Sequence, residues 1–175
     1  AGDEYPRHYR RPRPADDSNN VDESREELLL DPNVLAAGGF LSLGAFNVSP
    51  DHQRLAYSLD TSGEEIYTLY VKELATGKVS ELEFEHCDGS MTWANDSLTL
   101  FFGELDDTHR PHKLYRHTLG NTGAELVFEE SDGRFFLHCY RSSSERQLLL
   151  ALGSKTTSEV WALDAEQPHL AFTDR

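Results

Sequence analysis

Residues 44–84 read GAFNVSPDHQRLAYSLDTSGEEIYTLYVKELATGKVSELEF, and this stretch decides the fold class. It contains four runs in which apolar and polar side chains tend to alternate, at 44–48, 54–59, 66–74 and 79–84. Turn residues separate the runs: Ser-Pro-Asp, a polar loop that ends in Gly, and Ala-Thr-Gly-Lys. Alternation with a period of two between turn signals predicts four antiparallel strands.

The same pattern recurs twice further along the chain. An aromatic residue holds the same place in the third strand of each copy, at Tyr70, Tyr115 and Trp161, with spacings of 45 and 46 residues. A four-stranded repeat of about 40–50 residues is typical of a β-propeller blade. The sequence therefore predicts an all-β fold, a partial β-propeller of about three four-stranded antiparallel blades. We expect the three aromatic side chains to share one packing role.

The predicted organisation has two parts. Residues 1–30 form an extended N-terminal arm or linker, because three prolines and dense charge argue against regular structure there. Residues 31–175 form the partial propeller, with blades at 43–84, 90–129 and 134–172. Propellers typically have four to eight blades, so three blades are too few to close a ring. We therefore expect either a piece of a longer protein or self-association through exposed blade faces.

The composition disfavours two classes of partner. The net charge is −15, whereas nucleic-acid binding needs a basic face. No apolar run is long enough for a membrane span, so we expect no membrane partner and a cytoplasmic location. In that compartment Cys87 and Cys139 are expected to be half-buried free thiols and not a disulfide.

The motifs of common catalytic sites are missing from the sequence. Residues 88–91 (DGSM) come nearest to the Gly-x-Ser-x-Gly nucleophile elbow but lack its second glycine, so no catalytic residue is predicted. His109, His112 and His117 are the one histidine cluster. His112 and His117 lie five apart on a predicted strand and point to opposite faces, so we expect exposed histidines, with no metal and no cofactor.

Glu104, Asp106 and Asp107 form an acidic group at a predicted polar loop. Two interpretations stay open. The group is a solvated loop, or it steers basic peptides toward a binding site by raising their local concentration.

An ordered series of sequence segments indicates a particular protein family and not only a fold class. Residues 29–33 (LLDPN), 40–46 (FLSLGAF), 48–51 (VSPD), 55–58 (LAYS) and 60–65 (DTSGEE) resemble the opening of the propeller in the prolyl oligopeptidase family. Later segments resemble the oligopeptidase B (protease II) branch: 110–117 (RPHKLYRH), 132–136 (DGRFF) and 157–161 (TSEVW). The resemblance covers nearly all of residues 27–164.

This resemblance implies a serine peptidase built from a seven-bladed propeller and an α/β-hydrolase domain. The oligopeptidase B branch cleaves short peptides after Lys or Arg, and the propeller restricts substrate entry. The catalytic triad lies in the hydrolase domain, and no position here matches it, so this chain alone is predicted to be inactive. The implied partners are the remaining blades, the hydrolase domain and short basic peptides. The alternative is a non-catalytic interaction scaffold, although the Trp-Asp and Gly-His signatures of WD40 blades are missing from the sequence.

Overall fold

The computed structural model describes residues 3–12 and 23–174. The chain divides into two compact units, Ala1–Leu41 and Ser42–Arg175, and each is described by itself. In the described part of the chain, the helices are too short to cross a membrane.

The first unit is a small two-stranded sheet followed by a single helical turn. Its elements are β1 (His8–Arg10), the 3-10 turn η1 (Glu23–Arg25), β2 (Glu27–Leu30) and α1 (Pro32–Ala36). β1 and β2 pair antiparallel, so part of the predicted arm is an extended strand with a partner. The middle of that arm, residues 13–22, lies outside the described residues.

Helix α1 starts at the Asp-Pro-Asn turn. The Asp31 side chain accepts a hydrogen bond from the backbone N–H of Asn33, and Pro32 occupies the first helical turn, where its missing N–H costs nothing. The Asn33 side-chain oxygen in turn accepts hydrogen bonds from the backbone N–H groups of Glu4 and Tyr5, both at 2.9 Å. This short turn therefore also fixes the position of residues 4 and 5 within the first unit.

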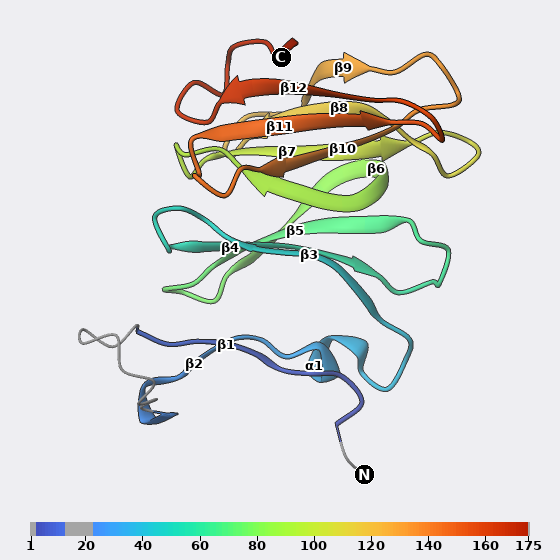
Figure 1. Cartoon of the computed structure of the whole chain (residues 1–175). Helices are drawn as coiled ribbons and strands as arrows, with labels where there is room; N and C mark the ends of the chain where they lie inside the picture. Colours follow the sequence, from blue (N-terminus) through green and yellow to red (C-terminus); the bar gives the residue numbers. More distant parts are fainter. Residues whose placement is uncertain (1–2, 13–22, 175) are drawn as a thin grey trace. The chain divides into compact units, whose positions relative to one another are not determined.

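The second unit consists of antiparallel strands that pair in chain order. They are β3 (Ser42–Val48), β4 (Arg54–Asp60), β5 (Tyr67–Glu73), β6 (Val79–Trp93), β7 (Thr99–Leu105), β8 (Pro111–Thr118), β9 (Glu125–Glu129), β10 (Phe136–Arg141), β11 (Gln147–Gly153), β12 (Ser158–Asp164) and β13 (Thr173–Asp174). One sheet runs from β3 to β9 and a second from β10 to β13 (Figure 1). Three successive four-stranded meanders result, and the predicted partial propeller is confirmed.

Strand β6 belongs to two blades at once. Its first half pairs with β5 and its second half with β7, with Leu82 opposite Leu69 and Met91 opposite Phe102. The sequence predicted instead that a strand ends at Phe84 and that the next blade starts at Ser90. The polar stretch between them does carry two left-handed residues, His86 (φ 53°) and Gly89 (φ 84°). These bend the strand and shift its register without ending it.

The repeated aromatic residues have equivalent positions. Tyr70 lies opposite Tyr57 with ring centroids 5.2 Å apart, and Tyr115 lies opposite Phe102 at 5.8 Å, each pair stacked across the second and third strands of its blade. Trp161 has the same register position in the third blade, opposite a leucine. The predicted equivalence of position is confirmed, whereas the ring partner of Trp161 is Phe128 of blade 2 and not a residue of its own blade.

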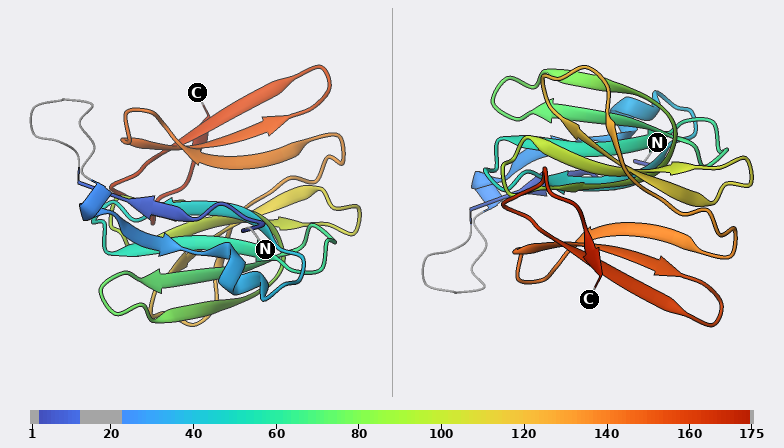
Figure 2. Two further views of the ribbon diagram at one scale, coloured as in Figure 1. Left: turned by 90° about the horizontal axis from the view of Figure 1, so that it is seen from below. Right: turned by 90° about the horizontal axis from the view of Figure 1, so that it is seen from above.

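Apolar side chains between neighbouring blades hold the stack together. Blade 1 contacts blade 2 through Phe84 and Phe102, whose rings stack at 4.6 Å. Blade 2 contacts blade 3 through a buried cluster that includes Phe101, Leu114 and Leu150. The sheet β10–β12 accordingly forms a layer against the strands of blade 2 (Figure 2).

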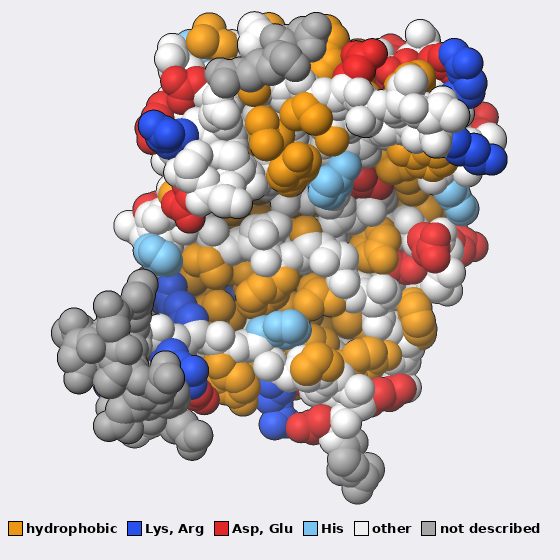
Figure 3. Space-filling view, in the orientation of Figure 1, with side chains coloured by type: hydrophobic (Ala, Val, Ile, Leu, Met, Phe, Trp, Pro, Cys, Tyr) orange, Lys and Arg blue, Asp and Glu red, His pale blue; other side chains and the backbone are white. Residues whose placement is uncertain are grey.

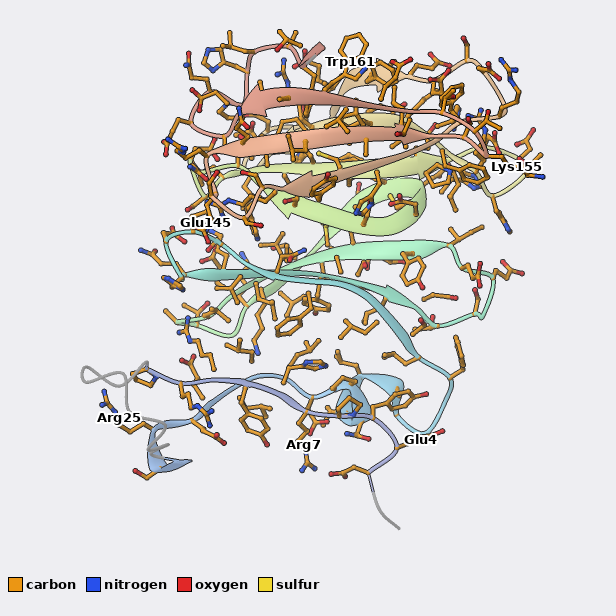
Figure 4. The ribbon with its side chains drawn as sticks, in the orientation of Figure 1. Glu4, Arg7, Arg25, Glu145, Lys155 and Trp161 are labelled. Atoms are coloured by element: carbon orange, nitrogen blue, oxygen red, sulfur yellow. The ribbon has the colours of Figure 1, made fainter. Side chains whose placement is uncertain are left out.

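Hairpin loops occupy the two ends of each blade. In blade 3, Glu145 lies in the loop between β10 and β11, and Lys155 lies at the opposite end between β11 and β12 (Figure 4). The corresponding loop between β4 and β5 begins at buried Asp60, whose carboxylate accepts the backbone N–H groups of Ser62, Gly63 and Glu65. Side-chain caps of this kind give the loops defined shapes.

Candidate functional site

The first strands of the three blades converge on one cavity of about 540 Å³. We call it the channel pocket, and it is lined by β3 (Gly44, Ala45 and Asn47), the second half of β6 (residues 88–92), β10 (residues 138–141) and Tyr67 of β5. Propeller blades surround a central channel. The channel pocket is therefore a stretch of channel wall, and it is the candidate functional site of this chain.

The Tyr67 ring fills the space between β3 and β6 at this wall. A Cβ atom at Gly44 would lie 2.9 Å from the ring, and one at Gly89 would lie 2.7 Å from it. The Tyr67 hydroxyl reaches Ser42 Oγ at 3.2 Å. The two glycines therefore allow an aromatic ring to lie directly against the backbone of both strands.

A buried hydroxyl joins three strands behind the pocket. The register between β3 and β4 shifts between Leu43 and Phe46. At this shift the backbone N–H of Ala45 donates to Ser58 Oγ at 2.7 Å, and Ser58 Oγ donates to the carbonyl of Gly89 at 2.6 Å. Ser58 is fully buried, so its hydroxyl satisfies two backbone groups that would otherwise have no partner there.

Asp88 places a carboxylate at the pocket, at the bend of β6. The carboxylate accepts the backbone N–H of Ser90 at 2.8 Å and its hydroxyl at 2.7 Å. It lies so close to Gly103 of β7 that a Cβ there would be 2.5 Å from Oδ2. Burial raises the pKa of Asp88, which the Ser90 hydrogen bonds and nearby His138 partly offset. Among the ion pairs of the described residues, none includes Asp88.

Strand β10 supplies the opposite side of the pocket. The rings of His138 and Tyr140 stack at 5.7 Å with an interplanar angle of 18°. Arg141 donates to the Asn95 side chain and lies 3.7 Å from a Glu145 carboxylate oxygen. The guanidinium is thus occupied by the β6–β7 loop of blade 2 and the β10–β11 loop of its own blade.

The three predicted steering residues lie elsewhere, and none of them lines the channel pocket. Glu104 is half-buried and pairs with Lys113 Nζ at 3.0 Å. Asp106 accepts hydrogen bonds from Thr108 and Arg110. These bonds lower the pKa of Asp106, and the bond from the Thr108 side chain has the largest effect. Asp107 is exposed at the loop. The structure therefore shows a capped loop, and the steering role stays a proposal.

The expectation of exposed strand histidines is wrong for His117. This side chain is buried, its Nδ1 lies 2.7 Å from the carbonyl oxygen of Gly123, and its ring meets Phe84 edge-on. The reason is that Phe84 belongs to the preceding blade, which covers this face of β8. His112 is half-buried and His109 is exposed. Within residues 3–12 and 23–174, no group of three His, Cys, Asp or Glu side chains is placed to hold a metal ion.

The two cysteines are free, as predicted, but fully buried where half-burial was expected. Burial raises the pKa of Cys87 to about 12 and also raises the pKa of Cys139. Both side chains are therefore neutral thiols that pack as small apolar groups.

Sequence reasoning missed Ser58 and Asp88. The sequence motif at residues 88–91 suggests only an incomplete nucleophile elbow. A usable signal was present in the Asp-Gly-Ser order, because an aspartate two residues before a serine, with glycine between them, is typical of a side-chain-capped bend. The burial of that bend depends on blade 3, which lies some 50 residues further along the chain.

Comparison with known proteins identifies the fold and its family. Residues 1–174 match the family described as "Prolyl oligopeptidase, N-terminal beta-propeller domain". The chain belongs to the prolyl oligopeptidase family. Among curated relatives, it is 35% identical over 153 residues to Protease 2 of Moraxella lacunata, covering 85% of this chain and 22% of the relative. It is 31% identical over 179 residues to dipeptidyl aminopeptidase BI of Pseudoxanthomonas mexicana, covering 95% of this chain and 25% of that protein.

Solved structures of the prolyl oligopeptidase family agree with this assignment. Oligopeptidase B from Trypanosoma brucei, with covalently bound antipain in a closed form, matches with a TM-score of 0.82 at 26% identity, covering 97% of this chain and 24% of that one. Oligopeptidase B from Leishmania major matches with a TM-score of 0.80 at 26% identity over 90% of this chain and 23% of that one. The chain thus spans about a quarter of the length of these relatives and corresponds to the N-terminal part of their propeller.

Proposed function

We propose that this chain is part of the channel-forming propeller of a serine oligopeptidase that hydrolyses short peptides after Lys or Arg. In this proposal the propeller admits peptides and excludes folded proteins, while a hydrolase domain supplies the catalytic groups. The observation that carries the proposal is the channel pocket, where the first strands of three successive blades converge in a family of peptidases.

Two further findings support this function. The relatives named Protease 2 and oligopeptidase B are peptidases by name. The net charge of −15 favours cationic peptides over anionic ones, because it raises the local concentration of positively charged solutes. The partners in this proposal are the remaining blades, the hydrolase domain and short basic peptides, and the proposed location is the cytoplasm.

Peptidase kinetics on the full-length protein test the proposal. Matched peptides that differ only in the residue before the cleaved bond (Arg, Lys, Leu or Pro) would be compared by kcat/KM. We expect cleavage after Arg and Lys, loss of activity on phosphonylation or sulfonylation of the catalytic serine, and no hydrolysis by residues 1–175 alone. A full-length protein that cleaves none of these peptides would contradict the proposal and favour the non-catalytic scaffold.

The acidic group Glu104, Asp106 and Asp107 has a separate test. We propose that it attracts basic peptides by long-range electrostatics, an effect that salt screens. Glu104→Gln and Asp107→Asn in the full-length enzyme should then weaken the salt dependence of kcat/KM for a dibasic peptide. An unchanged salt dependence would show that the group is only a solvated and capped loop.

A further inference from the structure

We infer that Asp88 is a substrate-binding residue of the channel wall: its carboxylate receives a cationic nitrogen of the peptide, either the α-ammonium group or a Lys or Arg side chain. This inference rests on the proposed function and adds a binding contact to it. Of the described residues that line the channel pocket, only Asp88 is acidic.

No lysine or arginine of the described residues pairs with Asp88, and His138 is the one basic side chain that acts on its charge. Its hydrogen-bond donors are the backbone N–H of Gly103 and the backbone N–H and hydroxyl of Ser90, all neutral groups. A carboxylate removed from water and held only by neutral donors attracts a nearby cation more strongly than an exposed carboxylate does. The bend of β6 therefore presents a fixed anionic group at the pocket.

The basic side chains of the pocket lining and of strand β8 have other partners. The Arg141 guanidinium donates to Asn95 and lies beside Glu145. Lys113, on β8 of the same blade, pairs with Glu104. His138 is the other basic side chain of the lining, and its ring stacks on Tyr140. An incoming ammonium or guanidinium group would thus meet a carboxylate that no lysine or arginine of the described residues already neutralises.

Aromatic rings make the same wall suitable for a cation. Tyr67 lies flat against Gly89, the residue after Asp88, and Tyr140 stands on the facing strand β10. Aromatic faces attract ammonium and guanidinium groups, and their apolar surface accommodates the carbon chain of a Lys or Arg side chain. A pocket that combines one carboxylate with two such rings favours a cation over a neutral polar group.

A purely structural role for Asp88 gives different results from a binding role. In the structural case the carboxylate only caps the bend of β6 through Ser90, and its loss affects every substrate alike. In the binding case its loss affects only peptides that carry a positive charge at the position facing Asp88. Peptides matched in shape but not in charge therefore separate the two roles.

The experiment uses the full-length enzyme and peptides that share one cleavage site. The peptides carry either a free or an acetylated amino terminus, and either Lys or its uncharged analogue norleucine at each non-cleaved position in turn. Wild-type enzyme should show a lower KM for one cationic member than for its neutral match. Asp88→Asn should raise the KM of that cationic peptide about tenfold, which is the loss expected for one charge-assisted hydrogen bond. The KM of the matched neutral peptide should stay within about twofold of its wild-type value. The acetylated series shows whether the group bound is the α-ammonium or a side chain.

Two control variants complete the test. Asp88→Glu keeps the charge and should retain a preference for the cationic peptide. Ser90→Ala removes the hydroxyl donor of the cap but keeps the carboxylate and the backbone N–H donor, and it should also retain the preference. An equal loss for cationic and neutral peptides in Asp88→Asn, or no change in either, would overturn the inference while leaving the peptidase assignment intact. Failure of the wild-type enzyme to cleave any peptide would instead overturn the proposed function.

Discussion

At the scale of single residues, small polar side chains that are buried or half-buried determine the local structure of this chain. Ser58 satisfies the backbone of two strands where the ladder between β3 and β4 shifts. Asp60 and Asp106 cap the equivalent loops of blades 1 and 2 with their carboxylates. Each of these side chains satisfies backbone groups that the sheets leave unpaired, so their removal has consequences that the residue type alone does not suggest.

Ser58→Ala should destabilise the chain by about 1–3 kcal/mol, because it leaves the N–H of Ala45 and the carbonyl of Gly89 buried without a partner. Urea denaturation measures the change. Ser80→Ala is the matched control, since Ser80 is exposed on β6, and it should change stability by less than about 0.5 kcal/mol. Equal stability of the two variants would contradict the role given to the Ser58 hydroxyl.

Asp106→Asn should lower stability at pH 7 by about 1 kcal/mol, and the difference from wild type should shrink on acidification. The hydrogen bonds from Thr108 and Arg110 lower the pKa of Asp106 in the folded state. Its contribution is therefore complete above the unfolded pKa of about 3.9 and is lost as the pH falls toward the folded value. Thermal melts from pH 7 to pH 2 test this, with exposed Asp107→Asn as the control. A difference that stays constant with pH would contradict it.

At the scale of elements, the connections between blades matter as much as the blades. β6 runs through two blades, and buried Arg110 links the β7–β8 loop to the segment that leads into blade 3. The Arg110 guanidinium donates to the carbonyl of Phe135 at 2.8 Å and to that of Glu130 at 3.4 Å. Arg110 thus fastens the segment that leads into blade 3 to the β7–β8 loop, in addition to the apolar cluster between the two blades.

Arg110→Ala should cost about 2 kcal/mol and accelerate amide exchange at residues 130–135, because it removes charge-assisted hydrogen bonds from a buried site. Hydrogen–deuterium exchange followed by mass spectrometry locates the effect. Arg134→Ala is the control, since its guanidinium side chain is 81% exposed and surface ion pairs contribute little. Unchanged exchange at residues 130–135 in Arg110→Ala would show that the connection does not depend on this side chain.

The strands also show which features of the fold could be predicted from the sequence. Alternating side chains and an aromatic residue at a fixed spacing located the strands of the repeat, because both signals are local. The continuity of β6 was missed, since a polar stretch with a glycine is also typical of a loop. The burial of His117 and Asp88 was missed because the covering side chains come from neighbouring blades. Local patterns identify blades, but contacts between blades decide which polar residues are buried.

At the scale of the whole molecule, the described blades still expose apolar side chains. Phe136 is 56% exposed, Leu170 is 45% exposed and Val160 is 37% exposed, all on blade 3 or the segment after it. Hydrophobic side chains reach the surface in the part of Figure 3 that corresponds to this blade. Exposed apolar side chains of this kind favour association.

Residues 1–175 in isolation should therefore self-associate, with a dimer fraction that rises with concentration in sedimentation velocity. Val160→Lys should shift the equilibrium toward monomer, because it places a charge on the exposed apolar surface. Thr156→Lys, at an exposed loop position of the same blade, is the control and should change little. A compact monomer at all concentrations would contradict this expectation.

The claim on which the rest depends is that the first strands of successive blades wall a channel that admits peptides only. The most direct measurement compares cleavage by the full-length enzyme of one Lys-containing segment in two forms, as a free peptide of about ten residues and within a stably folded domain. We predict rapid cleavage of the free peptide and no cleavage of the folded domain. The same domain should become a substrate only after it has been cut into short fragments. Comparable rates for the free peptide and the folded domain would contradict the account.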